Sequence, residues 1–139
     1  MSFEWKDRYS LNIPEIDEQH QKLFEIGYRA YELAMINDGS DYYDEIMAII
    51  DELLDYVEYH FEFEERLMER NLYSKFGTHC KEHNFYISKI KNMAHEEKID
   101  DNQQEALLNI LNFLSDWISN HILITDRQYV NEFKEKGLI

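Results

Sequence analysis

The chain has little glycine and proline, the residues that interrupt helices, and a single cysteine, the residue that cross-links small domains. Its 139 residues include one proline, four glycines and one cysteine. The single cysteine, Cys80, excludes a disulfide framework, a Cys-X-X-Cys redox motif and a rubredoxin-type iron site. With so little glycine and proline, and with apolar residues recurring at helical spacing, the sequence predicts a compact all-α protein.

Long apolar runs and an excess of positive charge are missing as well. No run approaches the ~20 apolar residues that a membrane-spanning helix needs. The first residues, MSFEWKDRYS, have neither the basic nor the apolar region of a signal peptide. The formal net charge of −15 disfavours binding to nucleic acid or to an anionic membrane. We therefore expect a cytoplasmic protein with no nucleic-acid or membrane partner.

Apolar periodicity predicts four helices within a single domain that covers residues 1–139. After an irregular arm at 1–16, the helices lie at about 17–38, 41–70, 74–97 and 101–135. Asp17 is a suitable N-cap for the first helix, and Gly39 is suited to end it. Because the connections are short, sequential helices should be antiparallel neighbours in an up-down-up-down four-helix bundle. A looser helical fold is the alternative, which four long apolar stripes with short joints disfavour.

Polar side chains occupy positions on the inward stripes where an ordinary bundle has aliphatic ones. They are His20, His60, Glu64, His79, His83 and His121. In HCKEH, for example, two histidines lie four residues apart and therefore share one helix face. Burying so many imidazoles and a carboxylate without partners would cost several kcal/mol, comparable to the net stability of a small domain. A shared metal centre would satisfy them all.

The fourth helix changes its register after His121. Beyond this residue the sequence fits better with Asp126, Tyr129 and Phe133 facing inward. Residues five apart point ~140° away from each other on an ideal α-helix. His121 and Asp126 can therefore serve one site only if a π-bulge or a break lies within 121–126, a distortion common at functional sites.

Taken together, these stretches resemble the hemerythrins, and more specifically the single-domain bacterial hemerythrins (bacteriohemerythrins). The resemblance covers nearly the whole chain and rests on IPEIDEQHQKLF, YHFEFEERLM, HCKEHNF and WISNHILITDRQY. One departure is Tyr73-Ser74, where the family often has Tyr-Pro before the third helix. This difference touches the start of a helix and none of the ligand positions.

The resemblance implies a non-haem di-iron centre. Its expected ligands are His79, His83 and His121 on one iron, His20 and His60 on the other, and Glu64 and Asp126 as bridges. An oxo or hydroxo group is the third bridge in the family, so the iron with two histidines keeps one open position for dioxygen. Zinc sites rarely need so many ligands, and ferritin-like di-iron sites use more carboxylates. The nitrogen-rich ligand set favours reversible dioxygen binding over substrate oxidation.

Four further residues are expected to line an oxygen pocket. Leu23, Tyr86 and Ile124 each follow a ligand position by three residues, and Trp117 precedes His121 by four. An apolar lining would keep water away from the site. Two polar residues are expected to lie in solvent instead, Glu65 beside Glu64 and His95 near the end of the third helix.

The leading hypothesis is therefore an oxygen carrier, store or sensor with no catalytic residues. The alternatives are a di-iron oxidoreductase that reduces dioxygen, peroxide or nitric oxide, and an iron-handling protein without gas chemistry. A reductase would need an electron-donor protein, because the chain carries no flavin, rubredoxin or dinucleotide motif of its own.

Overall fold

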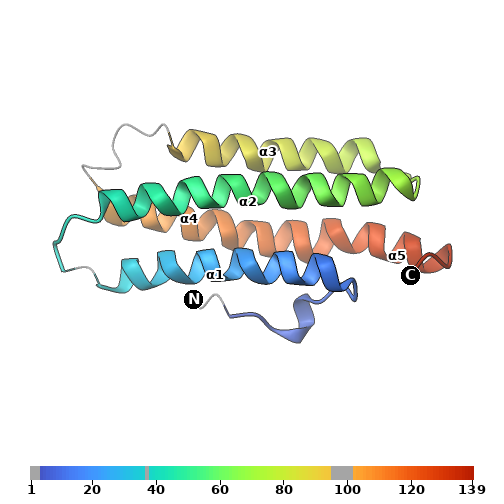
Figure 1. Cartoon of the computed structure of the whole chain (residues 1–139), viewed down its shortest axis with the longest axis horizontal. Helices are drawn as coiled ribbons and strands as arrows, with labels where there is room; N and C mark the ends of the chain where they lie inside the picture. The colour runs from blue at the N-terminus through green and yellow to red at the C-terminus, as the bar shows by residue number, and fades with distance from the viewer. Residues whose placement is uncertain (1–3, 37, 95–101) are drawn as a thin grey trace.

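Antiparallel helical rods lie side by side in the computed structural model, which describes residues 4–36, 38–94 and 102–139 (Figure 1). In chain order the elements are the 3-10 helix η1 (Asp7–Tyr9), α1 (Pro14–Ile36), α2 (Tyr43–Arg70), α3 (Phe76–Ala94), α4 (Gln103–Asp116), the π-helix η2 (Trp117–Asp126) and α5 (Arg127–Glu135). The last three form one continuous rod, and no strand occurs within the described ranges. The predicted all-α four-helix bundle is confirmed.

The first helix begins earlier than the sequence predicts. It starts at Pro14, whose fixed φ and missing N–H suit the first helical position, and not after an N-cap at Asp17. Asp17 lies inside the first turn and has a different task. Its carboxylate accepts hydrogen bonds from the Leu11 backbone N–H, at 2.8 Å, and from the Ser10 hydroxyl, and so fixes the N-terminal arm against α1.

The third helix begins later than predicted, at Phe76, and just before it lies a contact to α5 at Ser74. Its backbone N–H donates a hydrogen bond to Glu132 Oε2 at 3.0 Å, and its hydroxyl donates to the other oxygen of that carboxylate. Proline has no N–H and could not make the first bond. The departure from the family's Tyr-Pro pattern therefore links the start of α3 to α5.

At the remaining helix ends, the structure agrees with the predicted bounds to within a few residues where it describes them. Asn102 caps α4 by accepting a hydrogen bond from the Glu105 backbone N–H at 3.1 Å. The predicted helix limits at 97 and 101, like His95, fall outside the described residues. None of the described helices is both long and apolar enough to cross a membrane.

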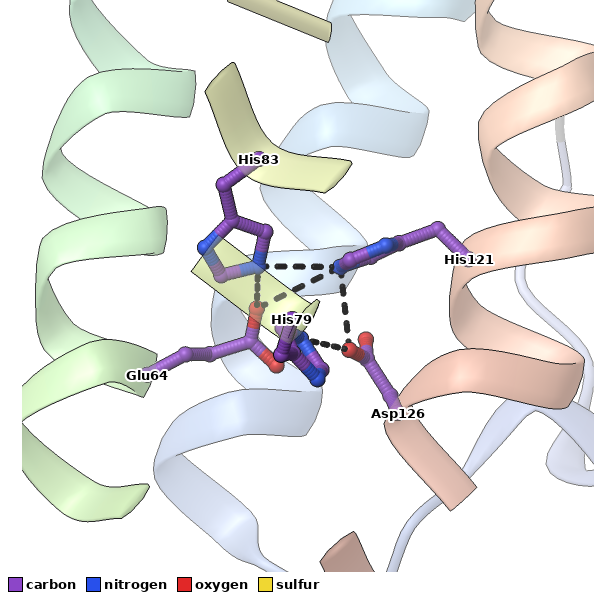
Figure 2. A group of neighbouring side chains, drawn as sticks. All are labelled: Glu64, His79, His83, His121 and Asp126. Carbon is purple, nitrogen blue, oxygen red and sulfur yellow. Dashed lines mark hydrogen bonds and ion pairs between the residues drawn. The ribbon is translucent and has the colours of Figure 1, made fainter. Parts of the chain in front are cut away.

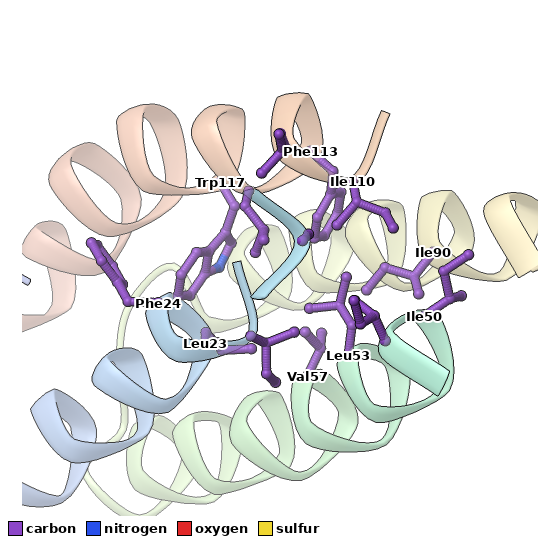
Figure 3. Packing of buried hydrophobic residues seen from close by; sticks show 14 of the residues in the cluster. Leu23, Phe24, Ile50, Leu53, Val57, Ile90, Ile110, Phe113 and Trp117 are labelled. Carbon is purple, nitrogen blue, oxygen red and sulfur yellow. The ribbon is translucent and has the colours of Figure 1, made fainter. Parts of the chain in front are cut away.

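Two apolar clusters fill the interior. The larger cluster runs through α1, α2, α3 and α4, with Leu53, Ile90 and Ile110 among its buried members (Figure 3). The smaller one closes the end of the bundle near the C-terminus and consists of Leu11, Ile16, Met68, Tyr73, Tyr129, Val130 and Phe133. Along each rod, the polar positions singled out above fall between these two clusters.

Candidate metal centre

A layer of buried polar side chains separates the two apolar clusters. We call it the polar layer; its members are Gln19, His20, His60, Glu64, His79, His83, His121 and Asp126. Every member is at most 6% exposed, although α-helical bundles normally bury aliphatic side chains at such depth. All seven predicted ligands belong to this layer. The structure thus brings them together from four rods.

Five of these side chains form the first of two groups able to hold a metal ion. Glu64, His79, His83, His121 and Asp126 each offer one ligand atom, all within 4.8 Å of one another (Figure 2). Asp126 Oδ1 lies 3.1 Å from His79 Nε2 and 3.0 Å from His121 Nε2. Glu64 Oε1 lies 3.4 Å from His83 Nε2. Three imidazoles thus surround two carboxylates.

The second group consists of His20, His60 and Glu64. The Nε2 atoms of the two histidines are 3.1 Å apart, and His60 Nε2 lies 3.1 Å from Glu64 Oε1. Glu64 therefore belongs to both groups. Asp126 also reaches toward both, because its Oδ2 lies 3.5 Å from His20 Nε2. The two carboxylates stand between a set of three histidines and a set of two.

The π-helix explains how His121 and Asp126 can share a site. The backbone hydrogen bonds of a π-helix such as η2 join residues five apart in sequence, whereas those of an α-helix join residues four apart. Residues five apart therefore lie about one turn apart, on the same side of the helix. The predicted distortion within 121–126 is thus part of a longer π-helix that begins at Trp117. The same widened turn directs Ile124 outward, where it is 56% exposed. The expectation that Ile124 lines a buried pocket, which assumed α-helical spacing, is wrong.

Hydrogen bonds at the outer ring nitrogens determine which way two of the imidazoles face. His83 Nδ1 donates to Glu65 Oε2 at 2.9 Å, because a carboxylate can only accept. His60 Nδ1 lies 2.7 Å from the amide oxygen of Gln19 and donates to it. When neutral, both rings therefore direct an Nε2 lone pair into the polar layer, which is the tautomer that a metal ligand requires.

Several atoms of the polar layer have no hydrogen-bond partner among the described residues. They are His20 Nδ1, Glu64 Oε1, both ring nitrogens of His79, His121 Nδ1 and both carboxylate oxygens of Asp126. Some of these atoms lie within 3.1 Å of a polar neighbour, but the angles do not fit a hydrogen bond. Leaving such groups buried and unsatisfied costs about 1–3 kcal/mol each, and more for charged groups. Among these atoms, the carboxylate oxygens and His79 Nε2 lie where the ligand atoms meet, and bound cations would satisfy them.

Electrostatics keep the two carboxylates ionised. Burial alone would raise the pKa of Glu64, but the surrounding imidazoles, His60 foremost, hold this pKa well below its usual range. Burial and the repulsion from Glu64 would raise the pKa of Asp126, but the imidazoles of His121 and His20 together lower it. Burial and the neighbouring carboxylates raise the pKa of Tyr129. Its hydroxyl therefore remains protonated and donates to Glu64 Oε2 at 2.9 Å.

The family model for the hemerythrin HHE cation binding domain matches residues 11–133. The chain belongs to the hemerythrin family. The bacteriohemerythrin of Clostridium acetobutylicum is 42% identical over 129 residues, or 93% of this chain and 99% of that protein. The bacteriohemerythrin of Methylococcus capsulatus is 28% identical over 121 residues, 87% of this chain and 88% of that protein. The bacteriohemerythrin of Stenotrophomonas maltophilia is 28% identical over 130 residues, 94% of this chain and 80% of that protein.

In this hemerythrin-family chain, three of the four residues predicted to line an oxygen pocket are buried beside the polar layer: Leu23, Tyr86 and Trp117. The Trp117 ring meets His20 edge-on with centroids 5.2 Å apart, and Tyr86 meets His121 at 5.4 Å. Leu23 is fully buried in the larger apolar cluster, one turn from His20. They place hydrophobic surface next to both histidine sets, while their part in an oxygen pocket stays a prediction.

Three residues contact the outer nitrogens of the histidines, and the sequence did not predict these contacts. Gln19 and Glu65 accept the hydrogen bonds described above, and Glu82 Oε1 lies 3.5 Å from His121 Nδ1. Glu65 was expected in solvent, but its side chain is only 34% exposed and also accepts a hydrogen bond from the Cys80 thiol at 3.3 Å. A Gln or Glu beside a ligand position is too common in an acidic helix to be recognised without the partner helix.

Proposed function

We propose that the chain is a non-haem di-iron protein that binds dioxygen reversibly. His79, His83 and His121 would hold one iron and His20 and His60 the other, with Glu64 and Asp126 as carboxylate bridges. When bound, such a pair of irons supplies two electrons and one open coordination position for a gas molecule. The observation that carries this proposal is the position of the two carboxylates, each within 3.5 Å of histidines from both sets.

The protein's own residues would prepare the site for this task. Gln19 and Glu65 fix the tautomers of His60 and His83 so that both Nε2 atoms face inward. Tyr129 donates a hydrogen bond from its hydroxyl to Glu64 Oε2 and leaves Oε1, the oxygen nearest His60 and His83, free for a metal. Trp117 and Leu23, both almost fully buried, exclude water beside the two-histidine set. Membership of the hemerythrin family supports the choice of iron and of dioxygen.

The direct test is a visible absorption spectrum of the ferrous protein, prepared without oxygen, then exposed to air and then degassed. We expect a coloured form that appears in air and fades on degassing. A colour that persists, or that develops only as a ferric end product, would contradict reversible binding. It would favour a reductase that takes electrons from a donor protein, or an iron-handling role.

The ligand assignment has a separate test. Glu64→Ala and Asp126→Ala should each lose the coupled two-iron centre, because each removes a fully buried bridging carboxylate. The measurement is the iron content per chain together with the visible spectrum. A His95→Ala variant is the control and should keep its iron. Two irons and an unchanged spectrum in either bridge variant would show that the bridging role is wrong.

A further inference from the structure

The histidines of the two sets are backed by groups of different charge. On the three-histidine side, His83 Nδ1 donates to the Glu65 carboxylate at 2.9 Å. On the same side, His121 Nδ1 lies 3.5 Å from the Glu82 carboxylate. Two of these three imidazoles therefore have a carboxylate near the outer ring nitrogen. Glu65 accepts a hydrogen bond there, whereas Glu82 acts through its charge alone, because His121 Nδ1 has no hydrogen-bond partner among the described residues.

The two-histidine side is backed differently. His60 Nδ1 donates to the amide oxygen of Gln19, which is neutral and only 6% exposed. His20 Nδ1 has no hydrogen-bond partner among the described residues. No ion pair links the outer nitrogen of either ring to a carboxylate within this part of the chain. The bridging carboxylates are shared, so Glu65 and Glu82 account for the difference in charge.

This difference has a chemical consequence for bound metal. A carboxylate that accepts the Nδ1 proton makes an imidazole a more basic ligand, and it adds a negative charge near the ion. Both effects stabilise the more highly charged ferric state over the ferrous state. A neutral amide fixes the tautomer equally well but adds no net charge. Glu65 and Glu82 lie partly in solvent, 34% and 28% exposed, which weakens but does not remove their effect.

We propose that Glu65 and Glu82 are positioning residues that separate the reduction potentials of the two irons, so that the iron of the three-histidine set is oxidised first. Gln19 adds no charge behind His60, so the reduction potential of the iron with the open position stays higher and this iron stays ferrous longer. The inference rests on the di-iron centre proposed above. It assigns to residues outside the ligand set the order in which the two irons would give up their electrons to the oxidant, which is dioxygen in the proposed function and the mediators in a titration.

The test is a redox titration of the iron-loaded protein without oxygen, with soluble mediators and with electron paramagnetic resonance of the one-electron-oxidised form. Glu65→Gln should raise the lower of the two potentials, because it removes a charge and keeps an acceptor. Gln19→Glu should lower the higher one. Both variants should therefore narrow the gap, and the equilibrium constant for forming the one-electron-oxidised state should fall about tenfold, or about 59 mV.

Glu69→Gln is the matched control, since Glu69 is an exposed acid on α2 one turn beyond Glu65. It should leave both potentials unchanged. The proposal is overturned if Glu65→Gln shifts the gap no more than this control, or if either variant widens it. Should Gln19→Glu not fold with two irons, Glu82→Gln takes its place and must also raise the lower potential.

The two proposals fail in different ways. The wild-type protein is first shown to hold two irons per chain by metal analysis. If it does not, the proposed function fails before any variant is compared. If it does, and the variants keep two irons with an unchanged gap between their potentials, only the role of Glu65, Glu82 and Gln19 is wrong.

Discussion

Around the first half of α2 the bundle interior is made of aliphatic side chains, whereas around its second half it is made of imidazoles and carboxylates. Ile50, Leu53, Ile90 and Ile110, which we call the aliphatic end, are all at most 1% exposed and pack together in the larger cluster (Figure 3). The histidines and carboxylates of the polar layer are buried almost as deeply, at most 2% exposed. Similar burial therefore has opposite energetic consequences in the two regions.

At the aliphatic end, burial itself is stabilising, at roughly 25 cal/mol for each Å² of apolar surface removed from water. In the polar layer, burial is costly until each nitrogen and oxygen has a partner. Several of those atoms have no hydrogen-bond partner within the described residues. The aliphatic end therefore stabilises the fold on its own, whereas the polar layer would be stabilised by the metal ions that we propose it binds.

Removal of the iron that we propose for the polar layer should have a large effect on stability. A ligand present at about 1,000 times its dissociation constant stabilises a protein by about 4 kcal/mol. For a chain of this length that corresponds to a fall in Tm on the order of 10–20 °C after chelation. Calorimetry of the loaded and chelated protein measures it. Amide hydrogen exchange should rise most near the polar layer and least at the aliphatic end. Equal melting temperatures would contradict the comparison.

Leu53→Ala tests the other region. Leu53 is fully buried at the aliphatic end, so its truncation should cost about 2–5 kcal/mol of the free energy of unfolding. Iron content should remain at the wild-type level, because no ligand is touched. Leu108→Ala, at a site 47% exposed on α4, is the control and should change stability by less than about 0.5 kcal/mol. Loss of iron in Leu53→Ala would mean that the two regions are not independent.

The 3.6-residue repeat predicted six of the eight members of the polar layer, His20, His60, Glu64, His79, His83 and His121, because buried helix positions recur at that spacing. The all-α bundle and the family are confirmed, and the seven expected ligands lie together. The i, i+5 spacing of His121 and Asp126 was enough to predict a helix distortion. What the periodicity could not give was the extent of the π-helix, and this is why Ile124 was placed on the wrong face.

Side-chain contacts between helices could not be predicted from the sequence either. Gln19 meets His60 and Glu65 meets His83 across helix pairs, and nothing local distinguishes these two residues from solvated neighbours. The start of α1 was missed for a related reason. Asp17 has the chemistry of an N-cap, but its carboxylate is used by the arm, so Pro14 begins the helix. In each case the deciding partner lies outside the segment that the pattern describes.

The smallest expected effect concerns a carboxylate outside both regions. Glu132 accepts two hydrogen bonds from Ser74, and its Oε2 lies 3.0 Å from Lys136 Nζ. These bonds, the Ser74 hydroxyl foremost, lower the pKa of Glu132 to about 2 from an ordinary 4.5. Because the folded-state pKa is the lower one, the stabilisation is complete above pH 4.5 and is lost as the pH falls toward 2.

Glu132→Gln should therefore be less stable than the wild type at neutral pH and equally stable near pH 2. Urea unfolding of the iron-free proteins at several pH values measures the difference, so that acid release of iron does not enter. A difference that does not depend on pH would mean that the substitution removes packing and not a charge-assisted hydrogen bond. Since the partners of Glu132 are protein groups, the difference at neutral pH should be the same with iron bound. That equality would set Glu132 apart from Glu64 and Asp126, because a carboxylate whose donors are already in place needs no ion.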